Sequence, residues 1–283
     1  MKATRRFVLL VAALCAVVRI GTAAPAFAQG SLQFGLLPSR STPETIRNYS
    51  PLKAYLERAL KREIILCTAP DFREYIRRTR AGEYDFLCTS APMARLAQQE
   101  AGFKPLVRVR DDFYGVLLVA TAAPYKKTAD LRGKMVATPD ALATASVLGQ
   151  KLFIDAGLQP GRDITLRPSP SSTSAALAVI YGTADAALIS DRSYRTLPSE
   201  EKAGLQLLAK TPSALGIIYM AHPRLGAALT ARLRMALLNF NKNKEESSQF
   251  FQSTGYTPVT EEDMQSLTPL LKMLNQRLAQ EQP

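Results

Sequence analysis

The chain has 283 residues and a formal net charge of +12, a length that allows one large or two modest domains. An excess of basic residues favours anionic ligands or a membrane surface, although we expect much of it to be solvated surface. Nucleic acid is not an expected partner, because no basic run is interleaved with stacking aromatic residues.

Residues 1–28 predict a signal peptide. Basic residues open the segment, an apolar run fills residues 7–18, and Ala-Phe-Ala at 26–28 is a small-x-small cleavage site. The alternative is a membrane anchor, but this run is too short to span a bilayer. We therefore expect cleavage after Ala28 and release into the periplasm. Losing four basic residues and no acidic ones would lower the charge from +12 to +8.

The mature chain begins with a predicted strand at 32–37 and a polar loop at 38–42. A helix follows, with apolar side chains spaced i, i+3, i+4 and i+8 from Leu52. The apolar run at 64–67 predicts the second strand. With the next helix and strand, this order is β-α-β-α-β, which indicates a parallel sheet.

The stretch from Asp71 to Pro92 predicts a helix, a glycine stop, a short buried strand and a polar loop. Asp71 is a suitable helix N-cap, and Gly82 stands where a left-handed residue ends a helix. Residues 85–88 form an apolar run, typical of a strand covered on both faces. Residues 89–92 follow at its carboxyl end, where open α/β sheets bind ligands.

The same order recurs from Ala175 to Arg192, and both copies carry G-x-x-D before an apolar run. Two similar units this far apart suggest two lobes of similar build. The alternative is that helix, glycine and strand simply follow one another in many α/β proteins. Between and after these units we expect the following elements: strands at 114–120, 135–137, 164–166, 205–208 and 217–220, a helix over 144–156, and a capping box of Thr260 with Asp263.

Two cysteines remain in the mature chain, Cys67 and Cys88, both near the ends of predicted strands. An oxidising compartment permits a disulfide. In the usual strand order the first strand lies between them, and neighbouring strands are about 4.8 Å apart, so the two Cα atoms would be too far apart to bridge easily. We expect two buried thiols, with a disulfide as the open alternative.

Several segments carry a family resemblance, and they read FGLLPSRSTPE, PLKAYLERAL, APDFREYIRRTRAGEYDFLCTSAP, FYGVLLVA, ADLRGKMVATP and AALAVIYGTADAALI. Together they resemble the phosphonate/phosphite/phosphate-binding periplasmic proteins of ABC transporters. The resemblance implies an α/β fold of the type II periplasmic binding protein kind. Each of its two lobes would be a mainly parallel sheet flanked by helices, with a ligand cleft at the hinge. It implies a first lobe at 29–118 and 214–283 and a second lobe at 119–213.

The ligand motifs depart from the family pattern. Such proteins hold the phosphoryl group with an S-T-S-G turn at a helix N-terminus, where backbone N–H groups suit an oxyanion. Here residues 141–144 read ALAT, and Thr144 and Ser146 supply the nearest hydroxyls. Ser172 stands where a histidine is frequent, and Thr89 replaces an aromatic residue. These changes argue against phosphonate as the ligand, but the helix N-terminus could still receive an anion.

The predicted ligand-binding residues form a hydrogen-bonding set with two guanidinium groups. Either arginine could hold a carboxylate, sulfonate or phosphate in bidentate fashion, or lie solvated on the surface. The hydroxyls at 172 and 173 are also suited to capping a helix, and the tyrosine suits either the core or the cleft wall. The set comprises Ser39, Arg40, Ser41, Asp71, Thr89, Ser90, Tyr114, Thr144, Ser172, Thr173, Asp191 and Arg192.

The sequence does not predict an enzyme, a cofactor or a metal site. His222 is the single histidine and lies in an expected surface turn, and no G-x-S-x-G elbow or Walker loop is present. The leading hypothesis is a monomeric periplasmic solute-binding protein that closes on a small polar or anionic solute and delivers it to an ABC permease. The alternative is a periplasmic adaptor or sensor with the same fold that binds a partner protein. An enzyme on this fold is the third and least favoured hypothesis.

Overall fold

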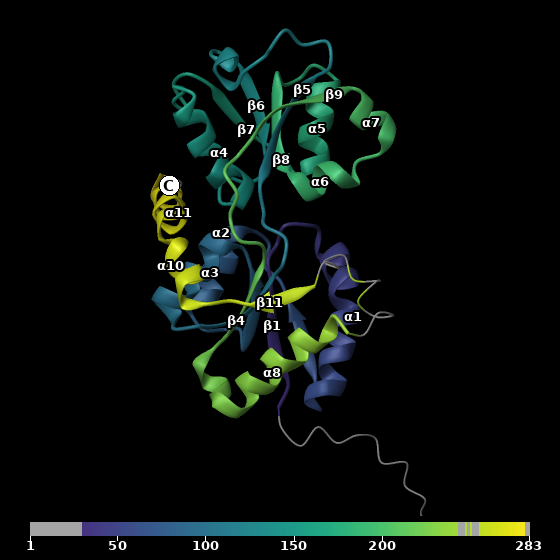
Figure 1. The fold of residues 1–283 in the computed structure, drawn as a ribbon, viewed down its shortest axis with the longest axis vertical. Coiled ribbons are helices and arrows are strands. Elements are labelled where there is room, and N and C mark those ends of the chain that lie inside the picture. The colour runs from purple at the N-terminus through teal and green to yellow at the C-terminus, as the bar shows by residue number, and fades with distance from the viewer. Residues whose placement is uncertain (1–29, 243–246, 248–249, 251–254, 281–283) are drawn as a thin grey trace, which may run out of the picture.

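The computed structural model describes residues 30–242, 247, 250 and 255–280, and it has two lobes stacked along its long axis (Figure 1). The predicted signal peptide and its cleavage site lie outside the described residues. The first lobe holds strands β1 (Leu32–Leu36), β2 (Ile64–Cys67), β3 (Phe86–Thr89), β4 (Lys104–Val109), β10 (Ile218–Ala221) and β11 (Tyr256–Pro258). Its helices are α1 (Thr42–Leu60), α2 (Phe72–Arg80), α3 (Ala91–Ala101), η2 (Pro223–Leu225), α8 (Gly226–Phe240), α10 (Glu261–Ser266) and α11 (Thr268–Gln280).

The second lobe is built from the middle of the chain. Its strands are β5 (Gly115–Ala120), β6 (Met135–Thr138), β7 (Thr165–Pro168), β8 (Ala186–Ser190) and β9 (Leu205–Lys210). Its helices are η1 (Thr128–Leu131), α4 (Thr144–Asp155), α5 (Ser172–Ile180), α6 (Asp191–Thr196) and α7 (Ser199–Ala203). The chain therefore leaves the first lobe once and returns to it once, as Figure 1 shows.

Both sheets are mixed. The six-stranded sheet has the order β11-β4-β10-β3-β1-β2, and the five-stranded sheet has the order β7-β6-β8-β5-β9. In each sheet three strands run parallel, with β1 between β2 and β3 and with β6 between β7 and β8. The remaining pairings are antiparallel: β10 pairs with β3 and β4, β11 pairs with β4, and β5 pairs with β8 and β9. Among the described strands, only β10 and β11 in the first sheet and β5 in the second therefore run against the others. The prediction of two α/β lobes is confirmed, and in each sheet most strands run in one direction.

The repeated G-x-x-D motif has the same role in both lobes. In the first lobe, the backbone N–H of Gln33 in β1 donates to Asp85 Oδ2 at 2.7 Å, and the Asp85 N–H donates to the Gln33 carbonyl at 2.9 Å. In the second lobe, the N–H of Met135 in β6 donates to Asp185 Oδ2 at 2.9 Å, and the Asp185 N–H donates to the Met135 carbonyl at 2.9 Å. Each aspartate thus ties the start of one strand to its neighbour, which confirms two units of similar build.

Two crossing segments connect the lobes and pair with each other. Phe113 and Ala214 form an antiparallel bridge in which each backbone N–H donates to the other carbonyl at 2.8 Å. The strand predicted at 114–120 is β5, which begins at Gly115 and pairs along its length with β8 and β9 of the second sheet. The first crossing therefore precedes Gly115 and does not fall at residue 118. The strand predicted at 217–220 is β10, which pairs with β3 and β4 in the first lobe.

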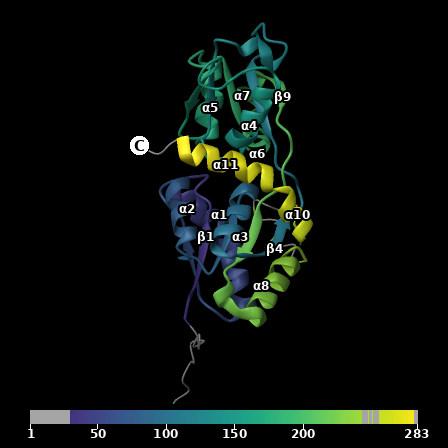
Figure 2. The same cartoon turned by 90° about the vertical axis from the view of Figure 1, so that its left-hand side faces the viewer.

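The helices cover both faces of the first sheet with separate cores. One core joins α1 and α8 to the sheet through buried side chains that include Phe34, Leu52 and Phe240. The other joins α2, α3 and α11 to the opposite face and also includes Val147 and Leu148 of α4 in the second lobe. In Figure 2, α11 runs across the molecule between the two lobes.

The two cysteines are free thiols and lie on strands separated by β1. Cys88 is fully buried, and its Sγ lies 3.0 Å from the hydroxyl of Tyr49. Cys67 is only half-buried and donates to Gln33 Oε1 at 3.0 Å. The expectation of free thiols is confirmed, but the expectation that both are buried is wrong for Cys67, since β2 is the edge strand of its sheet.

Candidate functional site

A cleft of about 950 Å³ lies between the lobes and is lined by both of them and by both crossing segments. It lies at the carboxyl ends of the parallel strands, where an α/β sheet places loops and helix N-termini. All of the predicted ligand-binding residues except Thr89 line this cleft. Thr89 is the last residue of β3 and not part of a loop, and its side chain is 1% exposed.

The first lobe contributes the loop after β1 and the starts of two helices. Ser39, Arg40 and Ser41 occupy that loop and are exposed. Asp71 is the N-cap of α2, as predicted, and accepts a hydrogen bond from the N–H of Glu74 at 2.7 Å. Ser90 is the N-cap of α3.

The second lobe contributes the first turns of three helices, and the first crossing contributes Tyr114. Thr144 opens α4, as predicted. Ser172 and Thr173 lie in the first turn of α5 and do not cap it. The structure corrects two of these predictions. The cap of α5 is Ser171, and the polar loop expected at Asp191 and Arg192 is the first turn of α6.

Six of the described helices begin at the cleft. They differ in whether the side chain of their N-cap residue accepts a hydrogen bond from an N–H group of the first turn. Ser171 accepts a hydrogen bond from Ser174 N–H in α5, and Ser190 accepts one from Ser193 N–H in α6, each at 3.0 Å. Asp71 does the same for α2. The N-caps of α1, α3 and α4 make no side-chain capping bond. Unsatisfied N–H groups at a helix start are a site for anions, which the helix dipole also favours.

The N-terminus of α4 has no side chain of its own that could cap it. Its N-cap is Ala143, which has no side-chain acceptor, and the first helical hydrogen bond runs from Val147 N to the Ala143 carbonyl at 3.0 Å. The N–H groups of Thr144, Ala145 and Ser146 precede that bond. The Thr144 hydroxyl, on a side chain that is 8% exposed, adds one more donor at the cleft wall. This turn can therefore donate several hydrogen bonds to one oxyanion.

Ser90 lines the cleft from the first lobe, and its hydroxyl oxygen is buried. The residue is 5% exposed, and its Oγ has no hydrogen-bond partner among the described residues. Its carbonyl already accepts the Ala94 N–H at 2.8 Å, whereas the N–H of Ala91 lies before the first helical bond. A buried hydroxyl without a partner is uncommon in folded proteins, and its place in a cleft-lining residue makes it a candidate hydrogen-bond donor at this site.

Most acidic side chains of the cleft already have partners. Glu44 pairs with Arg40, and Asp112 lies 3.4 Å from Arg108. Asp191 pairs with Arg195 at 3.0 Å and also accepts a hydrogen bond from the Tyr114 hydroxyl, which raises the pKa of Tyr114. These carboxylates are therefore largely neutralised and oppose an anion less than their number suggests.

Arg192 supplies positive charge at the same wall. Burial lowers the pKa of its guanidinium, yet an arginine remains protonated in proteins. A partly desolvated guanidinium binds an oxyanion more strongly than a fully solvated one, because water competes less for its donors.

The sequence analysis missed several cleft residues. They include Asn48, Asp111, Asp140, Ser169 and Arg195. Asp140 follows the end of β6 after one residue and Ser169 follows β7 directly, so the rule that ligands bind at carboxyl ends of parallel strands could have found them. The other three depend on the helix and crossing geometry, and no local signal marks them.

Three further features of the described residues concern a metal site, the single histidine and a membrane span. Within the described ranges, no cluster of histidine, cysteine or acidic residues has an arrangement that could hold a metal ion. His222 caps η2 by accepting a hydrogen bond from the Arg224 N–H at 3.2 Å, and its ring packs against Phe103. No helix in the described part of the chain is long and apolar enough to cross a membrane.

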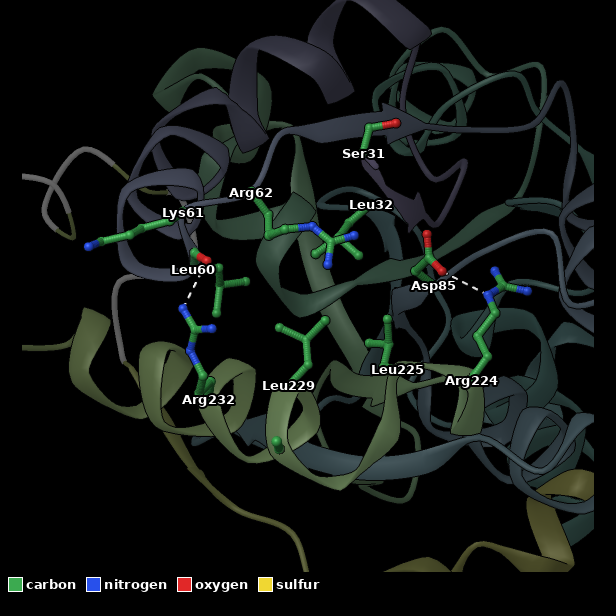
Figure 3. A pocket seen from close by; sticks show the side chains of 11 residues that line it. Ser31, Leu32, Leu60, Lys61, Arg62, Asp85, Arg224, Leu225, Leu229 and Arg232 are labelled. Carbon is green, nitrogen blue, oxygen red and sulfur yellow. Dashed lines mark hydrogen bonds and ion pairs between the residues drawn. The ribbon is translucent and has the colours of Figure 1, made fainter. Parts of the chain in front are cut away.

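A second hollow, of about 580 Å³, lies on the first lobe away from the cleft (Figure 3). It is basic, but its arginines hold structural partners. Arg224 Nε lies 2.7 Å from Asp85 Oδ1, Arg232 donates to the Leu60 carbonyl at 2.8 Å, and Arg62 Nε donates to the Gly30 carbonyl at 2.9 Å. These bonds fasten the end of α1 and the start of β1, so we assign this hollow a structural role.

The fold is shared with solved periplasmic binding proteins. XAC2383 from Xanthomonas citri, solved with a chloride ion, is 20% identical over 89% of this chain and 100% of that one, with a TM-score of 0.75. PhnD1 from Prochlorococcus marinus, in complex with methylphosphonate, is 14% identical over 87% of this chain and 98% of that one, with a TM-score of 0.77. The periplasmic aliphatic sulphonate binding protein SsuA from Escherichia coli is 17% identical over 89% of this chain and 88% of that one, with a TM-score of 0.62.

These likenesses confirm the two-lobed type II periplasmic binding protein fold. The family model described as "ABC transporter, phosphonate, periplasmic substrate-binding protein" matches residues 34–266, which include most of both lobes. That family consists of transporter binding proteins and is not a class of enzymes. Its match does not favour the alternative of an adaptor without a transport role. The chain therefore belongs to the family of periplasmic substrate-binding proteins of phosphonate ABC transporters.

Proposed function

We propose that this protein captures a small anionic solute in the interlobe cleft and delivers it to the permease of an ABC transporter. The observation that carries this proposal is the uncapped N-terminus of α4, whose cap and first residues, Ala143, Thr144 and Ala145, line the cleft. Three neighbouring helix starts are capped by their own side chains, so the open donors are confined to particular places.

The two lobes offer complementary donors. Ser90 and the start of α3 belong to the first lobe, whereas Thr144 and Arg192 belong to the second. A solute that accepts hydrogen bonds from both would bind the closed arrangement more tightly than the open one, and this difference in affinity is what drives closure. The paired crossing segments at Phe113 and Ala214 are the proposed hinge.

The geometry favours an anion without a cationic group beside it. An amine on the solute would need an acidic partner at the cleft wall. Here Asp191 is engaged by Arg195 and Tyr114. PhnD1 was solved with methylphosphonate and SsuA is a sulphonate-binding protein, and simple alkylphosphonates, alkylsulfonates and phosphate are therefore the first solutes to test.

The test is titration calorimetry, with thermal unfolding beside it, on the protein from Gln29 onward. The panel contains phosphate, phosphite, methylphosphonate, 2-aminoethylphosphonate, methanesulfonate, acetate and glucose. A ligand at about a hundred times its dissociation constant adds about 2.7 kcal/mol of stability. We expect an oxyanion to bind and 2-aminoethylphosphonate to bind more weakly than methylphosphonate. Binding of glucose alone, or of none of the panel, would contradict the proposal.

We also propose that residues 1–28 are removed on export and that the mature protein acts as a monomer. Mass spectrometry of the periplasmic protein should give an N-terminus at Gln29. Light scattering coupled to size exclusion should give the mass of a single chain. An uncleaved N-terminus or a dimer would require a different account of the mature protein.

A further inference from the structure

The C-terminal helix α11 belongs to the first lobe by chain order but contacts both lobes. It follows β11 and α10, which lie on the first lobe, and then passes between α3 and α4 (Figures 1 and 2). Helix α4 is the helix whose N-terminus forms the proposed anion site. If one lobe moves relative to the other, α11 must therefore either change its contacts with one lobe or move together with α4.

The apolar side of α11 joins the two lobes through one continuous core. Leu271, Leu274 and Leu278 are 5%, 0% and 9% exposed. They belong to the same cluster as Met93 and Ala94 of α3. In the second lobe this cluster includes Leu142, which precedes α4, and Val147 and Leu148 of α4. Apolar contacts of this kind stabilise the packing of α11 against both lobes, but they are not directional and so do not fix the orientation of one lobe relative to the other.

Arg277 adds a directional contact within this core. The residue is 8% exposed although it carries a charge. Its Nε donates to Gln150 Oε1 at 3.2 Å, and one of its terminal nitrogens donates to the Ser146 carbonyl at 3.2 Å. A buried charge is tolerated only where hydrogen-bond partners compensate for the lost water. Both of these partners belong to α4 in the other lobe, and Ser146 lies in the first turn of that helix.

We infer that Arg277 is a positioning residue that fixes α4, and with it the second lobe, relative to the first lobe. The guanidinium can keep both hydrogen bonds only over a narrow range of interlobe geometry, whereas the leucine contacts tolerate sliding. Arg277 thus limits the range of distances between the two lobes in the ligand-free protein. Its relevance to solute binding rests on the proposed function, but its effect on the lobes does not require any ligand.

The test measures the distance between the lobes in ligand-free protein. Spin labels at Met235→Cys on the first lobe and Tyr181→Cys on the second occupy side chains that are 55% and 74% exposed. The background carries Cys67→Ser, and Cys88 is fully buried. Pulsed electron paramagnetic resonance then gives the distribution of label distances. Arg277→Met keeps an unbranched side chain but removes both donors, so we expect a broader distribution. Hydrogen bonds to a charged group are worth a population change of about tenfold or more, so label pairs outside the wild-type range should rise by about that factor.

The matched control is Arg95→Met on α3. Arg95 is also a mostly buried arginine, but it donates to Gln98 at 2.6 Å and lies 3.7 Å from Glu261, all within the first lobe. We expect this variant to lose stability without any change in the distance distribution. Gln150→Met tests the same contact from the second lobe if Arg277→Met does not fold. A distribution that stays as narrow as wild type in both the Arg277 and Gln150 variants, or that broadens equally in Arg95→Met, would overturn the inference.

Discussion

The substitution Ala143→Asp separates folding stability from anion binding at the proposed site. Ala143 is the N-cap of α4, with φ −64° and ψ 144°, and it makes no side-chain capping bond. An aspartate fits this backbone and would accept hydrogen bonds from the same first-turn N–H groups that we assign to the solute. The variant therefore places a fixed negative charge where the anion is expected to bind.

The two effects have opposite signs. An N-cap aspartate in place of alanine stabilises a helix by about 1 kcal/mol. Two negative charges about 4 Å apart, at an effective dielectric constant of about 20, repel by about 4 kcal/mol, which corresponds to roughly a thousandfold loss of affinity. We therefore expect the free energy of unfolding to rise by about 1 kcal/mol while the dissociation constant of the anion rises about a thousandfold.

Urea unfolding and titration calorimetry with the tightest anion of the panel check both values. Ala143→Asn is the matched control, because it offers a neutral cap of the same size. It should stabilise α4 similarly but weaken binding much less. If Ala143→Asp binds the anion as tightly as wild type, the site is not at α4. If Asn and Asp reduce affinity equally, the charge of the solute is not what the helix recognises.

Three further predictions follow from single contacts. Ser90→Ala should leave the free energy of unfolding unchanged or raise it by about 1 kcal/mol, since Oγ has no partner among the described residues. The same variant should bind the anion about tenfold more weakly, and an unchanged affinity in calorimetry would contradict this prediction. Burial opposes the charge of Asp185, but hydrogen bonds from the Met135 N–H and the Tyr125 hydroxyl outweigh it and lower its pKa. The stability that this ionised carboxylate contributes is present above its pKa in the unfolded chain and is lost as the pH falls through its pKa in the folded protein. In an acid titration, Asp185→Asn should therefore lose less unfolding free energy below about pH 4 than the wild type does. An equal loss in the two proteins would refute this role. Burial raises the pKa of the Cys67 thiol, so a thiol reagent should label native Cys67 slowly and Cys88 only after unfolding, as mass spectrometry can measure; rapid labelling of Cys88 would contradict the packing.

The sequence by itself determined the features that depend on a few neighbouring residues. The capping of α2 by Asp71 and the capping box of Thr260 with Asp263 were predicted and are present, because each needs only a side chain and an N–H group three positions away. The left-handed Gly82 was predicted for the same local reason. The placement of loops at the carboxyl ends of parallel strands then brought nearly the whole predicted set to one cleft.

Only the tertiary structure decided which polar groups remain available in that cleft. The sequence offers several adjacent hydroxyls before α5, and the fold assigns the cap to Ser171 and leaves Ser172 and Thr173 in the first turn. It likewise decides that Ser90 Oγ has no hydrogen-bond partner among the described residues, since this depends on every side chain packed around it. The contact of Arg277 with Ser146 joins residues 131 positions apart. Such a contact exists only after both lobes have folded and packed together, and no local sequence pattern specifies it.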